Sequence, residues 1–491
     1  MKHKRYLCKI LVFGMATCLL LHVVIQILIP KYYYDDTWPT TSGFQGFYQM
    51  ERDSIDVLFL GSSCAAAGFN PQAVYDSCGI KSYNLGCEGQ SPLTTYYWLK
   101  EALRYQSPKA VLVETYFVFP YDSFEPLNAP ENSNRKAFDN MRWSPVKWEA
   151  VHDICKRDQN QTIESYYFPN IRYHTRWTEL NENDFCFEKW EKHYELKGYA
   201  PMNRRAGSES YAPFSGRDSG ERAEMVPLMK EYLDKIVELC EEKDVELILT
   251  KLPYTECNIA KYHTTSDYAS ERGISYWDFN EESIYNACGF VSAEDMNDDW
   301  HTNIWGAEKV SSYIAWRLHD EYGIEGGKDR QWEDTAAYYD RVYQDCELKN
   351  MTEIDRYLDA VNQERYTILI AVKGDAAAFL DENVKQLFRR LGAGLSMDCR
   401  ENGSYFAAIH EGSVEEGASM ERLVHHGSTR NGLLDFEITS EGFDSSYEGR
   451  ASIKINNQEF ARDGSGINMV VYNNERRQVI DSIRYDGEVE R

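Results

Sequence analysis

Three short segments of the chain carry residue types that together could perform acyl transfer. Ser63 follows Gly61 in a turn after an apolar run, where a serine at the start of a helix points into a crevice. Gly86 directly follows a second short strand, so its N–H can face a developing negative charge. Asp298 and His301 lie three residues apart, and in a tight loop the carboxylate can orient the imidazole as a general base for a serine. The sequence therefore predicts serine-based acyl chemistry.

Each of these segments also has an ordinary explanation. Serine is a preferred N-cap, so Ser62 and Ser63 fit a plain strand-to-helix turn. Gly86 fits a simple turn, and an Asp-x-x-His spacing is common by chance. The position of Asp298 and His301, after the last strand and just before the final helix of the α/β region, favours the functional interpretation.

The elements that would position these residues follow from apolar periodicity. Short apolar runs predict buried parallel strands at residues 56–60, 110–113 and 246–249. An amphipathic helix is expected over 224–243. Strands alternating with helices predict a three-layer α/β/α domain with a parallel sheet over 54–325, with its site at the carboxyl ends of the strands. Residues 121–215 break the alternation and predict an insertion over the sheet.

The N-terminal segment predicts a membrane anchor. Residues 10–30 contain no Asp, Glu, Lys or Arg, and about 20 apolar residues suffice to cross a bilayer. We expect an uncleaved signal anchor, with the basic tail 1–9 in the cytoplasm and everything after residue 31 outside the cell, beginning with a tether over 31–53. The alternative is a cleaved signal peptide, whose apolar core is normally shorter and ends in a small-residue cleavage site.

The C-terminal part predicts a separate unit. A glycine-containing break is followed by a helical linker over 326–365, and residues 366–491 predict an α+β domain rich in β-strands. No repeat of fixed period is present.

Composition excludes several classes of function. Lys and Arg total 53 against 79 Asp and Glu, a net charge of −26, which repels phosphate backbones and argues against a nucleic-acid binder. Hydrophobic residues make up 43% of the chain, enough for well-formed cores. The twelve cysteines form no CxxC pair and no Cys/His cluster with zinc-site spacing, so we expect no metal site, and nothing indicates a cofactor.

The combination of motifs resembles the SGNH/GDSL hydrolase superfamily over about residues 54–322. The resemblance implies that Ser63 is the nucleophile, His301 the base and Asp298 the acid that orients it, while Gly86 and the backbone N–H of Ser63 form the oxyanion hole. The usual Gly-Asp-Ser is Gly61-Ser62-Ser63 in this chain, which is similar to the branch containing the teichoic-acid D-alanylation protein and the alginate acetylation proteins.

One departure from the family pattern concerns the oxyanion hole. The third strand runs from Leu112 to Tyr116 without the Asn that the family uses as a donor, and Gln90 is the candidate substitute. A missing donor would lower the rate by ~10²–10³. A catalytically inactive SGNH-fold protein that binds glycans at the cell surface is therefore the alternative function.

The insertion contributes candidate substrate-binding residues. In a functional interpretation, His174, Arg176 and Trp177 form a wall of the acceptor site, with the tryptophan stacking on a sugar ring and the arginine holding an anionic group. In the structural alternative, the tryptophan packs over the sheet and the arginine belongs to an ion pair.

The C-terminal unit has a resemblance of its own. The segments 451–457, 466–473 and 479–482 are similar to the interleukin-like EMT inducer (ILEI) domain, and residues 368–375 with the helix that follows resemble the other half of that family. The two halves stand in reversed order, as in a circular permutation. Because such domains bind carbohydrate in some contexts, the resemblance implies a glycan-binding module; the alternative is a β-rich packing domain with no ligand.

These inferences combine into one expected function. We expect a single-pass membrane protein whose extracellular domain is a serine O-acyltransferase or esterase. It would add or remove acetyl or similar groups on a cell-envelope polysaccharide or teichoic-type polymer through an acyl-serine intermediate. The resemblance further implies a membrane-bound O-acyltransferase as a partner when the reaction is transfer.

Overall fold

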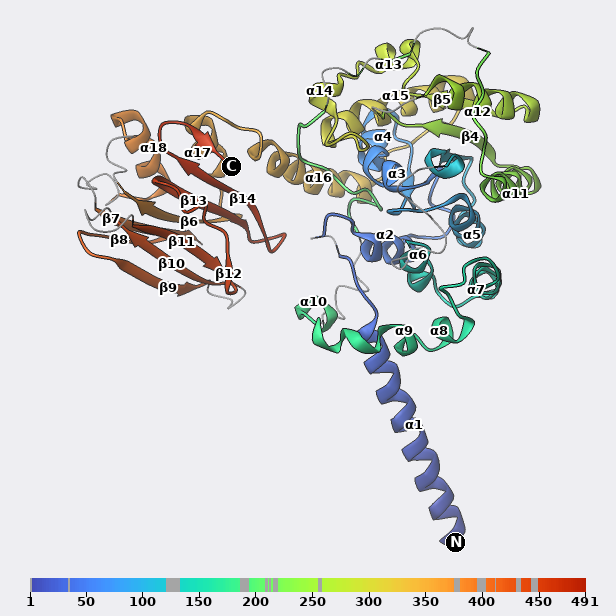
Figure 1. Cartoon of the computed structure of the whole chain (residues 1–491), viewed down its shortest axis with the longest axis horizontal. Coiled ribbons are helices and arrows are strands. Elements are labelled where there is room, and N and C mark those ends of the chain that lie inside the picture. Colours follow the sequence, from blue (N-terminus) through green and yellow to red (C-terminus); the bar gives the residue numbers. More distant parts are fainter. Residues whose placement is uncertain are drawn as a thin grey trace. The chain divides into compact units, whose positions relative to one another are not determined.

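The structure of the chain is a computed structural model, and it forms two compact units, Met1–Asp340 and Arg341–Arg491 (Figure 1). The residues that it describes are 2–33, 36–120, 133–185, 194–207, 211, 213–214, 220–254, 258–374, 380–394, 403–410, 412–429, 434–442 and 449–491.

The first unit is built on a five-stranded sheet in which every pair of neighbouring strands is parallel, as the sequence predicts. Its strands are β1 (Val57–Leu60), β2 (Ser82–Asn84), β3 (Ala110–Glu114), β4 (Glu246–Lys251) and β5 (Ser275–Asp278), in the spatial order β2-β1-β3-β4-β5. The chain passes outward from β1 to β2 and returns to β3 on the other side of β1. This reversal leaves a crevice at the carboxyl end of β1, the usual ligand position in open α/β sheets.

Helices cover both faces of this sheet because successive side chains of each strand point in opposite directions. Val57 and Phe59 belong to one buried cluster, which includes residues of α4 (Pro71–Cys78) and α15 (Ile304–Tyr322). Leu58 and Leu60 belong to a second cluster with α5 (Pro92–Ala102) and α11 (Pro227–Lys243). The predicted helix 224–243 begins at Pro227, since proline fits the first position of a helix. The other helices that follow β4 are α12 (Ile259–Arg272), α13 (Glu282–Cys288) and α14 (Ser292–Asp295).

The segment expected as a tether is partly a core element. Residues Thr40–Phe47 form helix α2, and all eight are buried. The ring of Phe44 stacks on Trp98 of α5 with centroids 4.0 Å apart. Small residues around the two phenylalanines of α2 allow this close packing, so α2 belongs to the folded domain rather than to a linker.

The helices of the predicted insertion pack on other helices of the first unit. Its described elements are α6 (Ser133–Asn140), α7 (Pro145–Arg157), α8 (Ile163–Tyr167), α9 (Asn170–Tyr173), the short 3₁₀ helix η2 (His174–Thr178) and α10 (Glu182–Phe185); residues 121–132, 186–193 and several positions between 208 and 215 lie outside the described part. Helix α6 packs against α2, and α7 packs against α5. Helices α9, η2 and α10 contact the end of the N-terminal helix (Figure 1). These helices thus run from the helical layer to the end of α1. Residues 194–207 return to the sheet, where the carbonyl of Lys197 accepts a hydrogen bond from the N–H of Asn84 in β2 and the N–H of Ala200 donates to the carbonyl of Ala66.

The N-terminal helix α1 spans Lys2–Leu28. Its stretch Tyr6–Leu28 has a mean hydropathy of 2.4 and is long and apolar enough to cross a membrane, a property that signal sequences share.

The second unit is rich in β-structure, as expected. Helix α16 (Arg330–Leu348) enters it, followed by α17 (Ile354–Val361), β6 (Tyr366–Lys373) and α18 (Glu382–Leu391). The later strands are β7 (Ser404–His410), β8 (Ser413–Ser419), β9 (Leu423–Ser428), β10 (Asp435–Glu441), β11 (Arg450–Ile455), β12 (Gln458–Glu459), β13 (Gly466–Asn473), β14 (Gln478–Tyr485) and β15 (Val489–Glu490). The central strand β6 pairs antiparallel with β13 and β7. One face of β6 packs on α17 and α18, and the other on residues of β10 and β11. Residue 375, in a segment that resembles the ILEI family, lies outside the described residues.

Candidate active site

The turn after β1 places a serine at the start of a helix. Gly61 has φ +147°, and a Cβ atom there would lie 2.6 Å from Cβ of Glu114, so the position requires glycine. Ser62 is the N-cap of helix α3 (Ser63–Gly68), and its Oγ accepts a hydrogen bond from the N–H of Cys64 (3.3 Å). Ser63 is therefore the first residue of α3, at the carboxyl end of β1.

A tight loop before α15 holds the Asp-x-x-His pair. Oδ1 of Asp298 accepts hydrogen bonds from the backbone N–H groups of Trp300 (2.8 Å) and His301 (2.9 Å), which fixes the loop conformation. The hydroxyl of Thr302 donates to the carbonyl of Ala67 (3.2 Å) and so ties the loop to α3. The contact through Thr302 uses none of the three candidate side chains, whereas the shape of the loop depends on Asp298 itself.

These two elements bring Ser63, His301 and Asp298 together. Nε2 of His301 lies 2.9 Å from Oγ of Ser63, and Nδ1 lies 2.9 and 3.0 Å from the two carboxylate oxygens of Asp298. This is the geometry of a nucleophile, a general base and an orienting acid.

The carboxyl group of Asp298 has a lowered pKa, which suits the role of an orienting acid. Burial alone would raise its pKa, but hydrogen bonds from His301 and from neighbouring groups lower the pKa from 3.8 to about 2. Asp298 is thus ionised wherever the imidazole can act as a base. Because the folded-state pKa is depressed, this carboxylate stabilises the folded protein above about pH 4, and the contribution is lost as the pH falls towards 2.

A residue that sequence reasoning missed lies against the imidazole. The ring of Trp38 is 5.0 Å from that of His301, with the ring planes tilted by 59°. Trp38 also lines a small pocket with Gly86, Cys87 and Ala66 of α3. The sequence did not indicate this contact, because Trp38 lies in the segment expected to be a tether. Trp38 reaches His301 because the following helix α2 packs into the folded domain.

Gly86 lies beside α3, but its N–H is engaged. A Cβ atom at Gly86 would lie 2.6 Å from the backbone N of Ala66, so glycine is needed for this close approach. The N–H of Gly86 donates to Oδ1 of Asn84 (2.8 Å), and the amide of Asn84 in turn donates to the carbonyls of Ala65 and Phe69. The assignment of Gly86 as an oxyanion donor stays a prediction. It requires that the N–H of Gly86 give up its hydrogen bond to Asn84 and donate to the oxyanion instead.

Gln90 is buried and bonded within its own segment. Its Nε2 donates to the hydroxyl of Thr95 on α5 (3.2 Å), while its Oε1 has no hydrogen-bond partner among the described residues. The structure gives it no contact with Ser63 or His301, so its role as a substitute oxyanion donor remains a hypothesis.

The structure does not bring His174, Arg176 and Trp177 to Ser63. They lie in η2 beside the end of α1, whereas Ser63 begins α3 at the sheet (Figure 1). The guanidinium of Arg176 donates to the carbonyl of Leu28 and forms an ion pair with Asp184, and Trp177 is 71% exposed. The ion pair of Arg176 agrees with the structural alternative for that residue, and the role of the three residues as a wall of the acceptor site stays a prediction.

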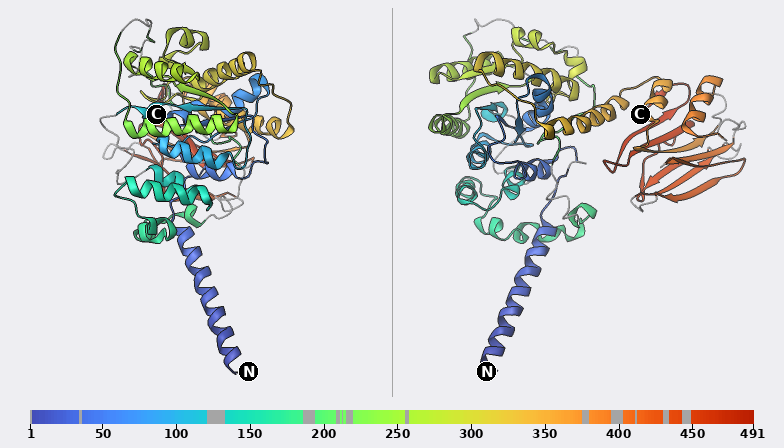
Figure 2. Two further views of the ribbon diagram at one scale, coloured as in Figure 1. Left: turned by 90° about the vertical axis from the view of Figure 1, so that its right-hand side faces the viewer. Right: turned by 180° about the vertical axis from the view of Figure 1, so that it is seen from behind.

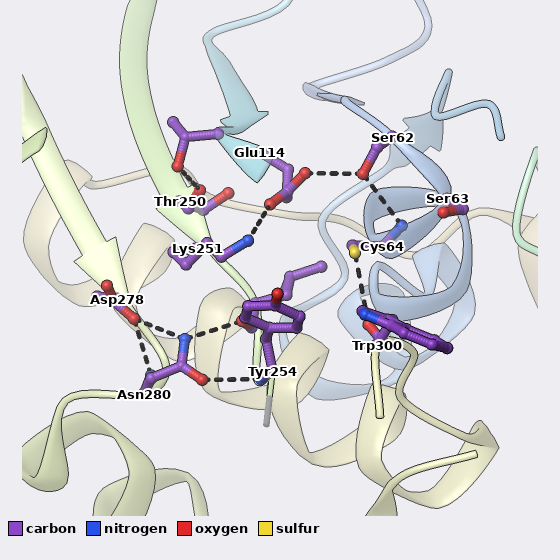
Figure 3. Close-up of polar contacts among 12 residues, drawn as sticks. Ser62, Ser63, Cys64, Glu114, Thr250, Lys251, Tyr254, Asp278, Asn280 and Trp300 are labelled. Atoms are coloured by element: carbon purple, nitrogen blue, oxygen red, sulfur yellow. Dashed lines mark hydrogen bonds and ion pairs between the residues drawn. The ribbon is translucent and has the colours of Figure 1, made fainter. Parts of the chain in front are cut away.

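A buried polar network connects the turn after β1 to strands β3 and β4 (Figure 3). Oγ of Ser62 donates to Glu114 (3.0 Å), and Glu114 forms an ion pair with Lys251 (3.3 Å). Ser62 belongs to this network, whereas the hydroxyl of Ser63 contacts His301. The pairing of Glu114 in β3 with Lys251 in β4 could not be inferred from one sequence.

Cys64, next to the serine, is not a competing nucleophile. Burial raises the pKa of its thiol to about 12, so the reactive thiolate is absent at neutral pH. The cysteines within the described part of the chain are free thiols. In the same part of the chain, no group of three His, Cys, Asp or Glu side chains is arranged to hold a metal ion.

The variant Glu114→Gln tests the network. It removes the carboxylate that pairs with the buried ammonium of Lys251 and leaves Asp278 as a nearby negative charge. We expect a loss of up to about 3 kcal/mol of stability, seen as a lower melting temperature of the full chain in detergent. The double variant Glu114→Gln with Lys251→Met removes both charges and should recover much of the loss. A single variant as stable as the wild type would show that the ion pair does not support the turn.

Comparison of the chain with protein-family models and with curated proteins finds no match in either case. The chemistry of the site therefore has to be argued from its geometry.

Proposed function

We propose that the protein is an SGNH-type serine O-acyltransferase or carbohydrate esterase. The observation that supports this most directly is the continuous chain of contacts from Ser63 Oγ to His301 to Asp298, each within hydrogen-bond distance. The position of the serine at the carboxyl end of β1, beside the reversal in strand order, agrees with the usual location of sites in such sheets.

The proposed reaction proceeds in two steps. Oγ of Ser63 attacks the acyl carbonyl while Nε2 of His301 takes its proton; the oxyanion collapses, the C–O bond of the ester breaks, and the leaving alkoxide takes the proton from His301. The acyl-serine is then attacked by a sugar hydroxyl in transfer or by water in hydrolysis, again with His301 as the base. The N–H of Ser63 is the proposed first donor to the oxyanion.

The substrate class and the location rest on the sequence resemblance and on α1. We propose that α1 remains as a single-pass anchor with its basic end in the cytoplasm, which places the site outside the cell next to envelope polymers. The proposed acceptor is a cell-envelope polysaccharide or a teichoic-type polymer, with a membrane-bound O-acyltransferase as the acyl supplier. The second unit, which resembles an ILEI domain, is the proposed glycan-binding module.

A second candidate function is an inactive, glycan-binding member of the same fold. The observation in its favour is the engaged N–H of Gly86, together with the lack of an Asn in the third strand. In this case the Ser63–His301 contact would persist in a protein that has no esterase or acyltransferase activity.

Trapping of the acyl-enzyme separates the two candidates. The full chain in detergent is mixed with p-nitrophenyl acetate, quenched in acid and digested, and the peptide that contains Ser63 is examined by mass spectrometry. We expect an acetyl group on Ser63, retained in the control variant Ser62→Ala. Absence of both the adduct and p-nitrophenol release, in a folded protein that binds glycan, would support the inactive candidate.

A further inference from the structure

The end of helix α1 is fastened to the insertion by buried charges. Nζ of Lys31 donates to the carbonyls of Ile27 and Ile29, and Arg176 donates to that of Leu28 (2.8 Å). These carbonyls have no partner within the helix, and the cations satisfy them. Asp184 pairs with Arg176 (2.9 Å) and lies 3.8 Å from Lys31, so one carboxylate faces both cations.

Apolar side chains are exposed on the elements around this junction. Helices α8, α9 and α10 gather at the end of α1 in both views of Figure 2, where they are drawn in green tones. Large apolar or aromatic side chains that are at least two-fifths exposed on these and the neighbouring elements are Trp143, Tyr167, Phe168, Ile171, Trp177 and Phe185. Aromatic side chains of this kind concentrate at membrane–water interfaces.

A cavity of about 290 Å³ lies between α1 and the insertion. On α1 it is lined by His22, Ile25, Gln26 and Ile29, which share one face because they are spaced three or four residues apart. His22 and Gln26, two of the few polar side chains in the second half of α1, therefore line this cavity.

The opposite wall carries positive charge. Arg142 and Lys147 line the cavity, and neither has a carboxylate partner among the described residues. Lys147 is buried and donates only to the carbonyl of Met141; burial lowers its pKa to about 8. The one acidic residue of the wall, Asp139, is already paired with Arg135 (2.8 Å).

The same wall holds an unsatisfied hydroxyl. Tyr166 is 2% exposed and lines the cavity, and its OH has no hydrogen-bond partner among the described residues. A buried polar group without a partner costs about 1–3 kcal/mol, so an acceptor placed in the cavity would be bound favourably.

We propose that this cavity binds the phosphate-bearing headgroup of one anionic phospholipid from the leaflet in which α1 ends. Arg142 and Lys147 offer positive charge to the phosphate, Tyr166 offers a hydroxyl donor, and the acyl chains lie along the apolar surface of α1. The proposal rests on α1 spanning the membrane and not on the catalytic function, so it stands if the site at Ser63 proves inactive.

The test uses the full chain purified in detergent, with native mass spectrometry to count bound lipid. The probes are phosphatidylglycerol, a diacylglycerol of the same acyl chains, and glycerol phosphate. We expect one phosphatidylglycerol per chain, bound at least about ten-fold more tightly than diacylglycerol, since the charged hydrogen bonds are absent from the latter. Glycerol phosphate should not displace the lipid.

Variants connect the binding to this cavity. Arg142→Gln and Tyr166→Phe should each weaken phosphatidylglycerol binding by about five- to ten-fold. Tyr166→Phe removes only a hydroxyl without a protein partner, so folding is preserved. Arg330→Gln, at a side chain that is 92% exposed in α16, is the matched control and should bind as the wild type does. Equal binding of diacylglycerol, displacement by glycerol phosphate, or unchanged binding in both cavity variants would each overturn the proposal.

Discussion

Replacement of Ser63 by alanine is expected to lower acyl-ester turnover by a factor on the order of 10⁴ to 10⁶, with the fold intact. Oγ of Ser63 lies 2.9 Å from Nε2 of His301, the proposed general base, and the variant removes the proposed nucleophile while leaving His301 and Asp298 in place. The measurement is release of p-nitrophenol from an acetyl ester by the full chain in detergent, with the melting temperature recorded alongside.

The neighbouring serine supplies the matched control for this experiment. Ser62→Ala removes the N-cap and the bond to Glu114, so it should lower stability by about 1 kcal/mol but keep acylation at Ser63. If Ser63→Ala retained turnover and Ser62→Ala lost it, the nucleophile would have been assigned to the wrong serine.

Replacement of Asp298 by asparagine is expected to lower the rate by a factor on the order of 10⁴. The amide oxygen can still accept the N–H groups of Trp300 and His301, so the loop should keep its shape. The amide cannot stabilise the imidazolium, and its NH₂ group favours the tautomer of His301 that is unable to accept the Ser63 proton.

The exposed neighbour Asp299 gives the control, because Asp299→Asn changes the same formal charge one residue away. It should retain nearly full turnover. In the wild type, protonation of Asp298 should not limit turnover until the pH approaches 2, because the pKa of this carboxyl is lowered to about 2. Near-full turnover in Asp298→Asn, with loss in Asp299→Asn, would transfer the orienting role to Asp299.

The sheet of the first unit was largely predictable because its strands are short, apolar and buried. The runs at 56–60, 110–113 and 246–249 overlap β1, β3 and β4, and each predicted bound differs from the observed one by two residues at most. The order of the motifs predicted that Ser63 follows β1 and that the loop 298–301 precedes the last helix of the α/β region, α15. Both lie at the same edge of the sheet. Local sequence carries this information because parallel strands present their carboxyl ends together.

Long-range contacts were the part that one sequence could not supply. Arg176 is 148 positions from Leu28, and no periodicity reveals that its guanidinium completes the end of α1. The same holds for Trp38 and His301, and for Glu114 and Lys251. In each case the side chain is of a type that fits several roles, and tertiary packing selects one of them.

The junction at the end of α1 also has a consequence for access to the site. Tyr32 exchanges hydrogen bonds with Thr41 in the first turn of α2, so the chain leaves the anchored helix and enters the folded domain within a few residues. Under the proposed function, this short connection would keep the enzyme close to the membrane surface. Ser63 would work at one fixed height above the lipid surface, and a polymer would be acylated or deacylated along the part of its length that passes that height.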